Sequence, residues 1–511
     1  MDTNPRPFIR RNGINWKPAT VFHEFCFLFC SLLLCSPVFA QELPVGTMVE
    51  VRMSGATGSR ISHRGDLVEA TIIAPVSVEG HILVPQGSKL LGSIENAVAV
   101  GFGLKHSLAS LAYAFHTLQL PNGVTLPVNT QLVEVETAKE DVDDLGTVHG
   151  IHPIMTLASS LDFYTVPLLL INPTVGAPVL CIKSVIAPSA NPEIYFPAGT
   201  ELILRFTTAV TLPAAKMDFP GSIKSFSRGD LTEFEYLLQN SAPRAYMGTR
   251  PSDEVNVLLL GSRGQMDRAF RASGWSQAQR KSPMSLFRIY HALTKRHGYA
   301  RAPMNGLTLN GVPSAFVHQK SLDTVQKRHH VRLWQYPRRA DIWMGAAAED
   351  VGFRFEYAHW THSTNPDIDS ERAKVVDDLA FTGCVYAAGL LPRVSADLVQ
   401  DPKTEHPIVT DGNVAVIRLN DCSHPKIMPG VSETPALHPR RKVVGMLASF
   451  RDDLLRSNIL FTTYNTFRFL AKRKSDPTTH TPLVNEPPRG LDWLTPLTPP
   501  QNRMAANLSG Q

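Results

Sequence analysis

Three short segments of one pattern limit what the first part of this chain can fold into. They are Pro44-Val45-Gly46-Thr47, Pro85-Gln86-Gly87-Ser88 and Pro197-Ala198-Gly199-Thr200. Proline presets the second residue of a type I turn and glycine suits the fourth, so each segment predicts a turn. A strand-like run with alternating apolar residues follows each turn, as in Leu202 to Phe206. Short strands joined by regular turns predict a mainly-β barrel or sandwich over residues 41–215.

The first 40 residues have the features of a secretory signal peptide. Arg6, Arg10 and Arg11 precede an uncharged, mostly apolar run, and Val38-Phe39-Ala40 offers small residues where a signal peptidase cleaves. We therefore expect an exported protein of the periplasm or cell envelope; the alternative is an uncleaved segment that tethers the chain to a membrane. The exported chain keeps three cysteines, Cys181, Cys384 and Cys422, which allow at most one internal disulfide and leave the pairing open.

An apolar excursion interrupts the β domain at residues 151–189. Phe163 to Ile182 has no charged residue, but Pro167, Pro173 and Pro178 divide it. Since prolines are costly in an unbraced helix, we expect an apolar loop or hairpin folded against the β domain. The alternative is a surface in segment 163–182 that contacts a membrane or a partner.

The chain has 511 residues, enough for two or three domains. After a connector at 216–253, residues 254–390 alternate helical and strand-like patterns, which predicts an α+β domain: an antiparallel sheet with helices on one face. Residues 391–474 are expected to form a mixed extension with a terminal helix. Residues 475–511 are rich in proline and polar residues and predict a disordered tail.

Several separated motifs of the α+β region follow the order found in LssY C-terminal domains. These are Asp253-Glu254-Val255-Asn256-Val257, Gly274-Trp275, Lys327 to Trp334, Trp343 to Ala347 with Asp350, and Thr361-His362 through Arg372. Roughly residues 250–390 thus resemble that domain, which implies a fold and an envelope setting but no reaction. The Pro-x-Gly-Thr turns, separately, are similar to those in β-barrel domains of outer-membrane conjugation and secretion scaffolds.

Strand alternation places Arg328, His330, Arg332 and Trp334 on one face of a strand, and His329 on the other. Arginine pairs bidentately with phosphate or carboxylate, and a neighbouring histidine donates or transfers a proton. The first set predicts a ligand-binding face for an anion, made of Arg328, Arg332 and Trp334. The alternative is a solvated basic strand whose arginines pair with acids. His329 is expected in the core, with its ring satisfied by a backbone carbonyl.

A second group of candidates follows this strand. His362, Asp367 and Asp369 are a common ligand set for a divalent metal, and Asp350 could add an oxygen. The sequence otherwise leaves the cofactor open. The competing explanation is helix capping, because acids before a helix accept its free N–H groups. If the two groups adjoin, His330, His362 and Asp350 become candidate catalytic residues that activate water.

These features leave the question of enzyme activity open and favour a binding or scaffold protein that recognises an anionic envelope ligand or an envelope protein. One alternative is a periplasmic metal- or histidine-assisted hydrolase of phosphoesterase type, acting on lipid or polysaccharide precursors. Another is a subunit of a secretion apparatus. A net charge of +5 with 19% charged residues does not predict nucleic-acid binding.

Overall fold

The structure, a computed structural model, describes residues 41–100, 108–151, 157–187, 190–212, 223–320, 324–356, 359–393, 408–431, 491, 493 and 494. The expected signal peptide and the terminal helix expected in 391–474 lie outside these residues. By its contacts the chain divides into two units. The first consists of residues 1–42 and 211–216, and the second consists of all the other residues. The second unit contains the N-terminal β domain (residues 43–210) and the C-terminal domain (residues 223–431).

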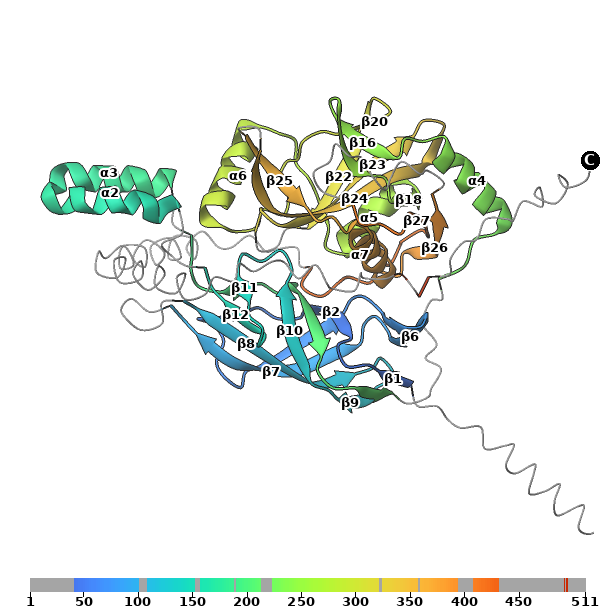
Figure 1. Cartoon of the computed structure of the whole chain (residues 1–511), viewed down its shortest axis with the longest axis horizontal. Helices are drawn as coiled ribbons and strands as arrows, with labels where there is room; N and C mark the ends of the chain where they lie inside the picture. Colours follow the sequence, from blue (N-terminus) through green and yellow to red (C-terminus); the bar gives the residue numbers. More distant parts are fainter. Residues whose placement is uncertain are drawn as a thin grey trace, which may run out of the picture. The chain divides into compact units, whose positions relative to one another are not determined.

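Nine strands form the main sheet among the described residues of the N-terminal β domain (Figure 1). They are β2 (Met48–Met53), β4 (Leu67–Ile72), β7 (Lys89–Val98), β8 (Ser110–Gln119), β9 (Thr125–Pro127), β10 (Thr130–Val135), β11 (Asp141–Val142), β12 (Thr147–His149) and β14 (Glu201–Phe206). Three smaller pairs are β1 (Gln41–Leu43) with β15 (Val210–Leu212), β3 (Thr57–Gly58) with β13 (Tyr195–Phe196), and β5 (Val76–Val78) with β6 (His81–Val84).

Eight of the nine strands follow the order β10-β14-β2-β4-β7-β8-β12-β11, and the two ends of this row approach each other. The amide side chain of Gln131 in β10 donates to the carbonyl of Asp144, between β11 and β12, at 2.5 Å. Val51, Leu90 and Leu204 are fully buried by the curved sheet. A nearly closed, barrel-like sheet confirms the predicted mainly-β domain.

All three repeated turns form, but with a different geometry from the one we expected. In each, the N–H of the threonine or serine donates to the proline carbonyl at 3.2 Å, so proline is the first residue and glycine the third. The glycines have φ of +90°, +86° and +91°, the left-handed conformation that the third position of a type II turn requires. The hydroxyls of Thr47, Ser88 and Thr200 donate to the same carbonyls, which explains the fourth residue of the pattern.

The apolar excursion forms two helices, α2 (Leu157–Ile171) and α3 (Pro173–Ile186), with Pro167 and Pro178 inside them. We expected an apolar loop or hairpin because prolines are costly in an unbraced helix; the segment is a hairpin, but one made of two helices. A side-chain carbon at Gly176 would meet the backbone of Leu169 at 2.3 Å, so this glycine lets the helices pack closely and brace each other. No helix in the described part of the chain has the length and apolar character needed to cross a bilayer.

The C-terminal domain is built on an eight-stranded mixed sheet in the order β19-β22-β23-β24-β18-β27-β26, with β25 paired to β24. The strands are β18 (Val257–Leu260), β19 (Ser276–Gln277), β22 (Phe316–Lys320), β23 (Arg328–Tyr336), β24 (Arg339–Glu356), β25 (His359–Thr364), β26 (Val385–Pro392) and β27 (Asn413–Leu419). A four-stranded sheet contains β16 (Arg244–Met247), β17 (Arg250–Glu254), β20 (Thr308–Leu309) and β21 (Val312–Pro313). The helices are α4 (Arg228–Gln239), α5 (Arg263–Ala272), α6 (Pro283–Lys295) and α7 (Ile368–Phe381).

This architecture confirms an α+β domain and extends it. Helices α5 and α7 pack in one apolar core with Val257, Val331 and Ile417, while α4, from the expected connector, packs through Phe234 in a second core. Strand β27 lies beyond the expected boundary at 390 and pairs in parallel with β18. Leu491 and Leu494, from the expected disordered tail, are buried in the first core.

Candidate functional site

Strand β23 presents the predicted alternation. Because β22 and β24 pair with it on either side, the strand is internal to the sheet, and Arg328, His330, Arg332 and Trp334 are all buried. These four side chains are therefore not solvated, but both arginines pair with acids, as the alternative expected. Trp334 belongs to the apolar core with Leu258 and Met344, so its indole is a packing group rather than part of an anion-binding face.

Arg328 brings the two predicted groups together. It lies opposite Asp350 in the pairing of β23 with β24, and its Nε donates to Asp350 Oδ2 at 2.7 Å. One of its terminal nitrogens, Nη2, lies 3.2 Å from His362 Nε2 in β25. Three adjacent strands thus position these side chains.

Asp253, at the end of β17, completes the group. Its carboxylate accepts from Arg332 and lies 3.3 Å from His330 Nε2. We call Asp253, Arg328, His330, Arg332, Asp350 and His362 the Arg–His cluster. Asp253 opens the first family motif but was not among the site residues predicted from sequence. It pairs with residues of β23, more than 70 positions further along the chain.

Burial and charge set the protonation states in the Arg–His cluster. Burial opposes ionisation of Asp253 and Asp350, but the neighbouring Arg332, Arg328 and histidines outweigh it and lower both pKa values. Burial, reinforced by the charge of Arg328, lowers the pKa of His362 to about 4 despite Asp350. His362 is therefore neutral at pH 7. With Nε2 accepting from Arg328, its proton sits on Nδ1, 3.4 Å from Asp350 Oδ2.

Two buried nitrogens of the Arg–His cluster, Arg332 Nε and His330 Nδ1, have no hydrogen-bond partner, but His330 Nδ1 lies 3.8 Å from Asp350 Oδ2. Leaving such groups unpaired is costly, and Arg332 Nε carries a hydrogen at every physiological pH. His362 retains 28% of its side-chain exposure, so the cluster reaches the surface there. The Nε–H of Arg332 can therefore donate to an oxygen of a bound ligand.

The predicted metal ligands do not converge. Asp367 is the N-cap of α7 and accepts from the N–H groups of Asp369 and Ser370 at 3.1 Å. The Asp369 carboxylate accepts from Arg372 and from Thr410, at 2.8 and 2.9 Å. In the described part of the chain, neither aspartate belongs with His362 to a group of converging ligand atoms. The capping role that competed with the metal site is present for Asp367.

A buried ion network that sequence reasoning missed joins the N-terminal β domain to the C-terminal domain. Lys374 of α7 contacts Glu50 of β2, Glu136, which follows β10, and Glu201 of β14. Lys320 of β22 lies 2.8 Å from Glu201. Burial opposes the charge of Lys374, but the three carboxylates raise its pKa well above the usual value. No local pattern predicts this network, because its residues come from elements far apart in sequence.

His329, which alternates to the opposite face from the Arg–His cluster, is buried as expected, but its partners are carboxylates rather than a backbone carbonyl. Nδ1 lies 2.8 Å from Glu371 and Nε2 lies 3.5 Å from Glu136. Burial disfavours its charge, yet these two carboxylates raise its pKa well above 6.5.

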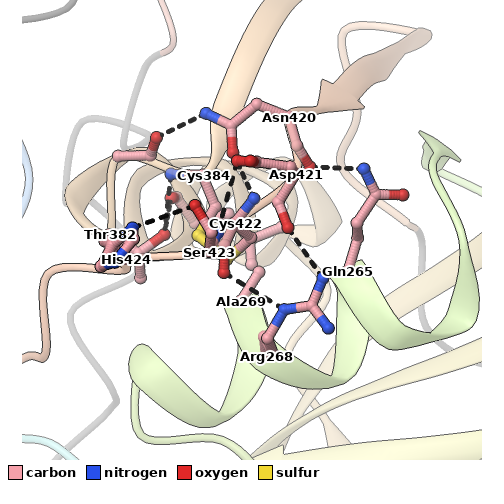
Figure 2. The surroundings of a disulfide bond; sticks show 12 residues. Gln265, Arg268, Ala269, Thr382, Cys384, Asn420, Asp421, Cys422, Ser423 and His424 are labelled. Carbon is pink, nitrogen blue, oxygen red and sulfur yellow. Dashed lines mark hydrogen bonds between the residues drawn. A yellow bond between two sulfur atoms is a disulfide. The ribbon is translucent and has the colours of Figure 1, made fainter.

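Cys384 and Cys422 form a disulfide, which resolves the pairing that the sequence left open (Figure 2). The bond links the segment after α7 to the loop after β27. Arg268 of α5 donates to the carbonyls of Asp421 and Cys422, at 2.7 and 3.2 Å, and so fixes the same loop (Figure 2). Cys181 in α3 is exposed and is a free cysteine.

Comparison with known proteins decides the family of the C-terminal domain. Residues 238–414 match the family described as the LssY C-terminus. This part of the chain is an LssY C-terminal domain. The match begins in α4 and ends in β27, so the domain is wider at both ends than our sequence motifs indicated.

The LssY C-terminal domain occupies about a third of the chain, and other comparisons address the rest. No curated protein matches the sequence. Among solved structures, the chain is similar to ComB10 of the Com type IV secretion system of Helicobacter pylori, with 13% identity and a TM-score of 0.19. That likeness covers 35% of this chain and 94% of that one.

Proposed function

We propose that this is an exported binding or scaffold protein of the cell envelope whose LssY C-terminal domain recognises a phosphate- or carboxylate-bearing ligand at the Arg–His cluster. The carrying observation is the buried Nε of Arg332, which has no hydrogen-bond partner. A ligand oxygen at Arg332 Nε would satisfy a donor that the fold leaves without a hydrogen bond, and the neighbouring Arg328 adds positive charge.

Calorimetric titration with inorganic phosphate and with acetate tests this proposal. Arg332→Lys keeps the charge that pairs with Asp253 but removes the Nε–H and the planar fork. Arg339→Lys is the matched control, because Arg339 pairs with Asp341 at the surface, away from the cluster. We expect Arg332→Lys to weaken binding at least tenfold and Arg339→Lys to leave it unchanged. No heat with either anion, or equal binding by both variants, contradicts the proposal.

We further propose that the α2–α3 hairpin contacts a lipid bilayer. Large apolar side chains are exposed on it: Tyr164, Leu170, Ile171, Val175, Ile182 and Ile186. Between Phe163 and Ile186 the only charged residue is Lys183, which is buried. Such a surface matches acyl chains better than water.

Flotation with vesicles of phosphatidylethanolamine and phosphatidylglycerol tests the bilayer contact. The double variant Leu170→Glu, Ile171→Glu should remain unbound, while Leu67→Glu, an exposed leucine of the N-terminal β domain, should float as the parent protein does. Equal flotation of all three proteins, or none by the parent, refutes the contact.

A hydrolase is the second candidate, favoured by the pair formed by His362 and Asp350. A neutral imidazole beside a carboxylate can accept a proton from water, which for His362 requires that Nε2 leave its hydrogen bond with Arg328. Activity on p-nitrophenyl phosphate that His362→Ala abolishes, without loss of the folded state, would support it. Absence of turnover, or equal turnover by the variant, counts against this candidate and leaves ligand recognition as the role of the cluster.

A further inference from the structure

We infer that His329, Glu349 and Glu371 form a binding site for one divalent transition-metal ion, separate from the Arg–His cluster. One imidazole nitrogen and one carboxylate oxygen from each acid all lie within 4.8 Å of one another. Ligand atoms around a bound zinc ion, at bond lengths of about 2.0–2.2 Å, are separated by roughly 3–4 Å. Small side-chain movements therefore bring the three groups to coordinating distance.

The three candidate ligands come from two neighbouring strands and from a helix that packs on the sheet. His329 of β23 and Glu349 of β24 are direct partners in the antiparallel pairing, so their side chains leave the sheet together. Glu371 comes from the first turn of α7, which packs across the sheet. The site thus rests on internal strands and a helix, the rigid elements that a preorganised metal centre needs.

One carboxylate oxygen of Glu371 is buried without a hydrogen bond. Glu371 is 3% exposed; its Oε2 lies 2.8 Å from His329 Nδ1, but its other oxygen, Oε1, is buried with no hydrogen-bond partner. A buried carboxylate oxygen without a partner is destabilising. A metal ion between the three residues would give this oxygen a partner.

Outer contacts hold Glu349 in place. The Nδ2 of Asn365 donates to Glu349 Oε2 at 2.8 Å, and the Asn365 N–H donates to the Glu349 carbonyl at 2.9 Å. Hydrogen bonds of this kind orient the carboxylate ligands of metals and leave one oxygen for coordination.

A second group of converging acids in this protein, by contrast, already contains a lysine. Glu50, Glu136 and Glu201 also converge, but the ammonium of Lys374 contacts all three and supplies the cation. For Glu349 and Glu371, no ion pair with a lysine or arginine occurs among the described residues. The proposed metal site therefore has acidic ligands and no lysine or arginine. There the imidazole of His329 is the partner of Glu371, and a metal ion would bind that ring with release of its proton.

The donor set indicates the class of metal. One imidazole with two carboxylates suits Mn²⁺, Fe²⁺ or Zn²⁺, whereas Ca²⁺ and Mg²⁺ prefer oxygen alone. Three protein ligands also leave a coordination position for a further ligand.

Metal analysis of the full-length protein, purified without chelators, followed by calorimetric titration with Mn²⁺ and Zn²⁺, tests the inference. We expect about one equivalent per chain, with affinity reduced about 10- to 100-fold in Glu349→Gln. Glu254→Gln, which changes a buried carboxylate of the same domain paired with Arg244, is the matched control and should bind as the parent does. No binding of either metal, or equal binding by Glu349→Gln, overturns the inference.

A second measurement needs no variant. Pulsed electron paramagnetic resonance of the parent protein with one equivalent of Mn²⁺ should show nitrogen coupling from the His329 ring. Bound Mn²⁺ without nitrogen coupling places the ion elsewhere and overturns the site. Phosphate binding by the Arg–His cluster is measured separately, so the failure of either proposal leaves the other intact.

Discussion

The ammonium of Lys374 lies 2.8 Å from the Oε2 of Glu201, so a helix of the C-terminal domain and a strand of the N-terminal β domain share a buried ion pair. Burial opposes the ionisation of Glu201, but Lys320 and Lys374 outweigh it and lower its pKa. Each charge therefore depends on partners from the other domain.

Removing the lysine charge should be strongly destabilising. Lys374→Met leaves Glu50, Glu136 and Glu201 with less positive charge in a buried position, which should lower the free energy of unfolding by about 3–5 kcal/mol. Denaturant titration measures the loss. Lys89→Met is the control: Lys89 pairs with Glu69 at 3.0 Å on the surface, where the expected loss is below about 1 kcal/mol. Equal losses in the two variants would disprove the special role of Lys374.

Stability should fall in mild acid because of His318. This histidine is stacked on Phe270 at 4.4 Å between ring centres, and burial lowers its pKa to about 4. The folded protein therefore binds fewer protons than the unfolded chain, whose histidine titrates near 6.5. Stability is complete above pH 6.5 and is lost as pH falls towards 4, by roughly 3 kcal/mol from this group.

Melting temperatures of the parent, His318→Gln and His116→Gln between pH 7.5 and 4.5 test this origin. His318→Gln should flatten the pH dependence, whereas His116, an exposed histidine of the N-terminal β domain, should not affect it. An unchanged slope in His318→Gln would assign the acid sensitivity to other groups.

The disulfide should contribute substantially to stability. Cys384 and Cys422 are 38 residues apart, and closing a loop of this length reduces the entropy of the unfolded chain by an amount equivalent to about 4 kcal/mol. The double variant Cys384→Ser, Cys422→Ser should lose about 2–5 kcal/mol in denaturant titration. Cys181→Ser, at an exposed cysteine outside the disulfide, should match the parent protein; no loss in the double variant would contradict the prediction.

A close approach of two glycines should make one position intolerant of any side chain. A carbon added at Gly430 would lie 2.2 Å from the backbone nitrogen of Gly199, whereas one at Gly412 would meet nothing within 4 Å. Both glycines have positive φ, +71° and +76°, so backbone strain is matched. Gly430→Ala should therefore destabilise more than Gly412→Ala, by about 1–3 kcal/mol in thermal unfolding. Similar melting temperatures would show that the backbones separate easily.

Much of the local structure followed from sequence because short-range geometry decides it. Met266, Ala269 and Phe270 recur at helical spacing, and they form the buried face of α5. The alternation in β23 correctly grouped Arg328 with His330 and Arg332. The prolines at residues 151–189 did not indicate helices, because α2 and α3 stabilise each other by packing together, and this contact cannot be read from either segment alone.

By itself, then, the sequence determined the β-rich first domain, the α+β second domain, its LssY resemblance and the face of β23 that holds the arginines. These depend on periodicity and on turn residues, which act within a few positions. Only the tertiary structure decided which acids meet those arginines, which cysteines pair and that Lys374 meets Glu201. Such partners come from distant segments, and burial then sets their charges, so the chemistry of the site exists only after folding brings them together.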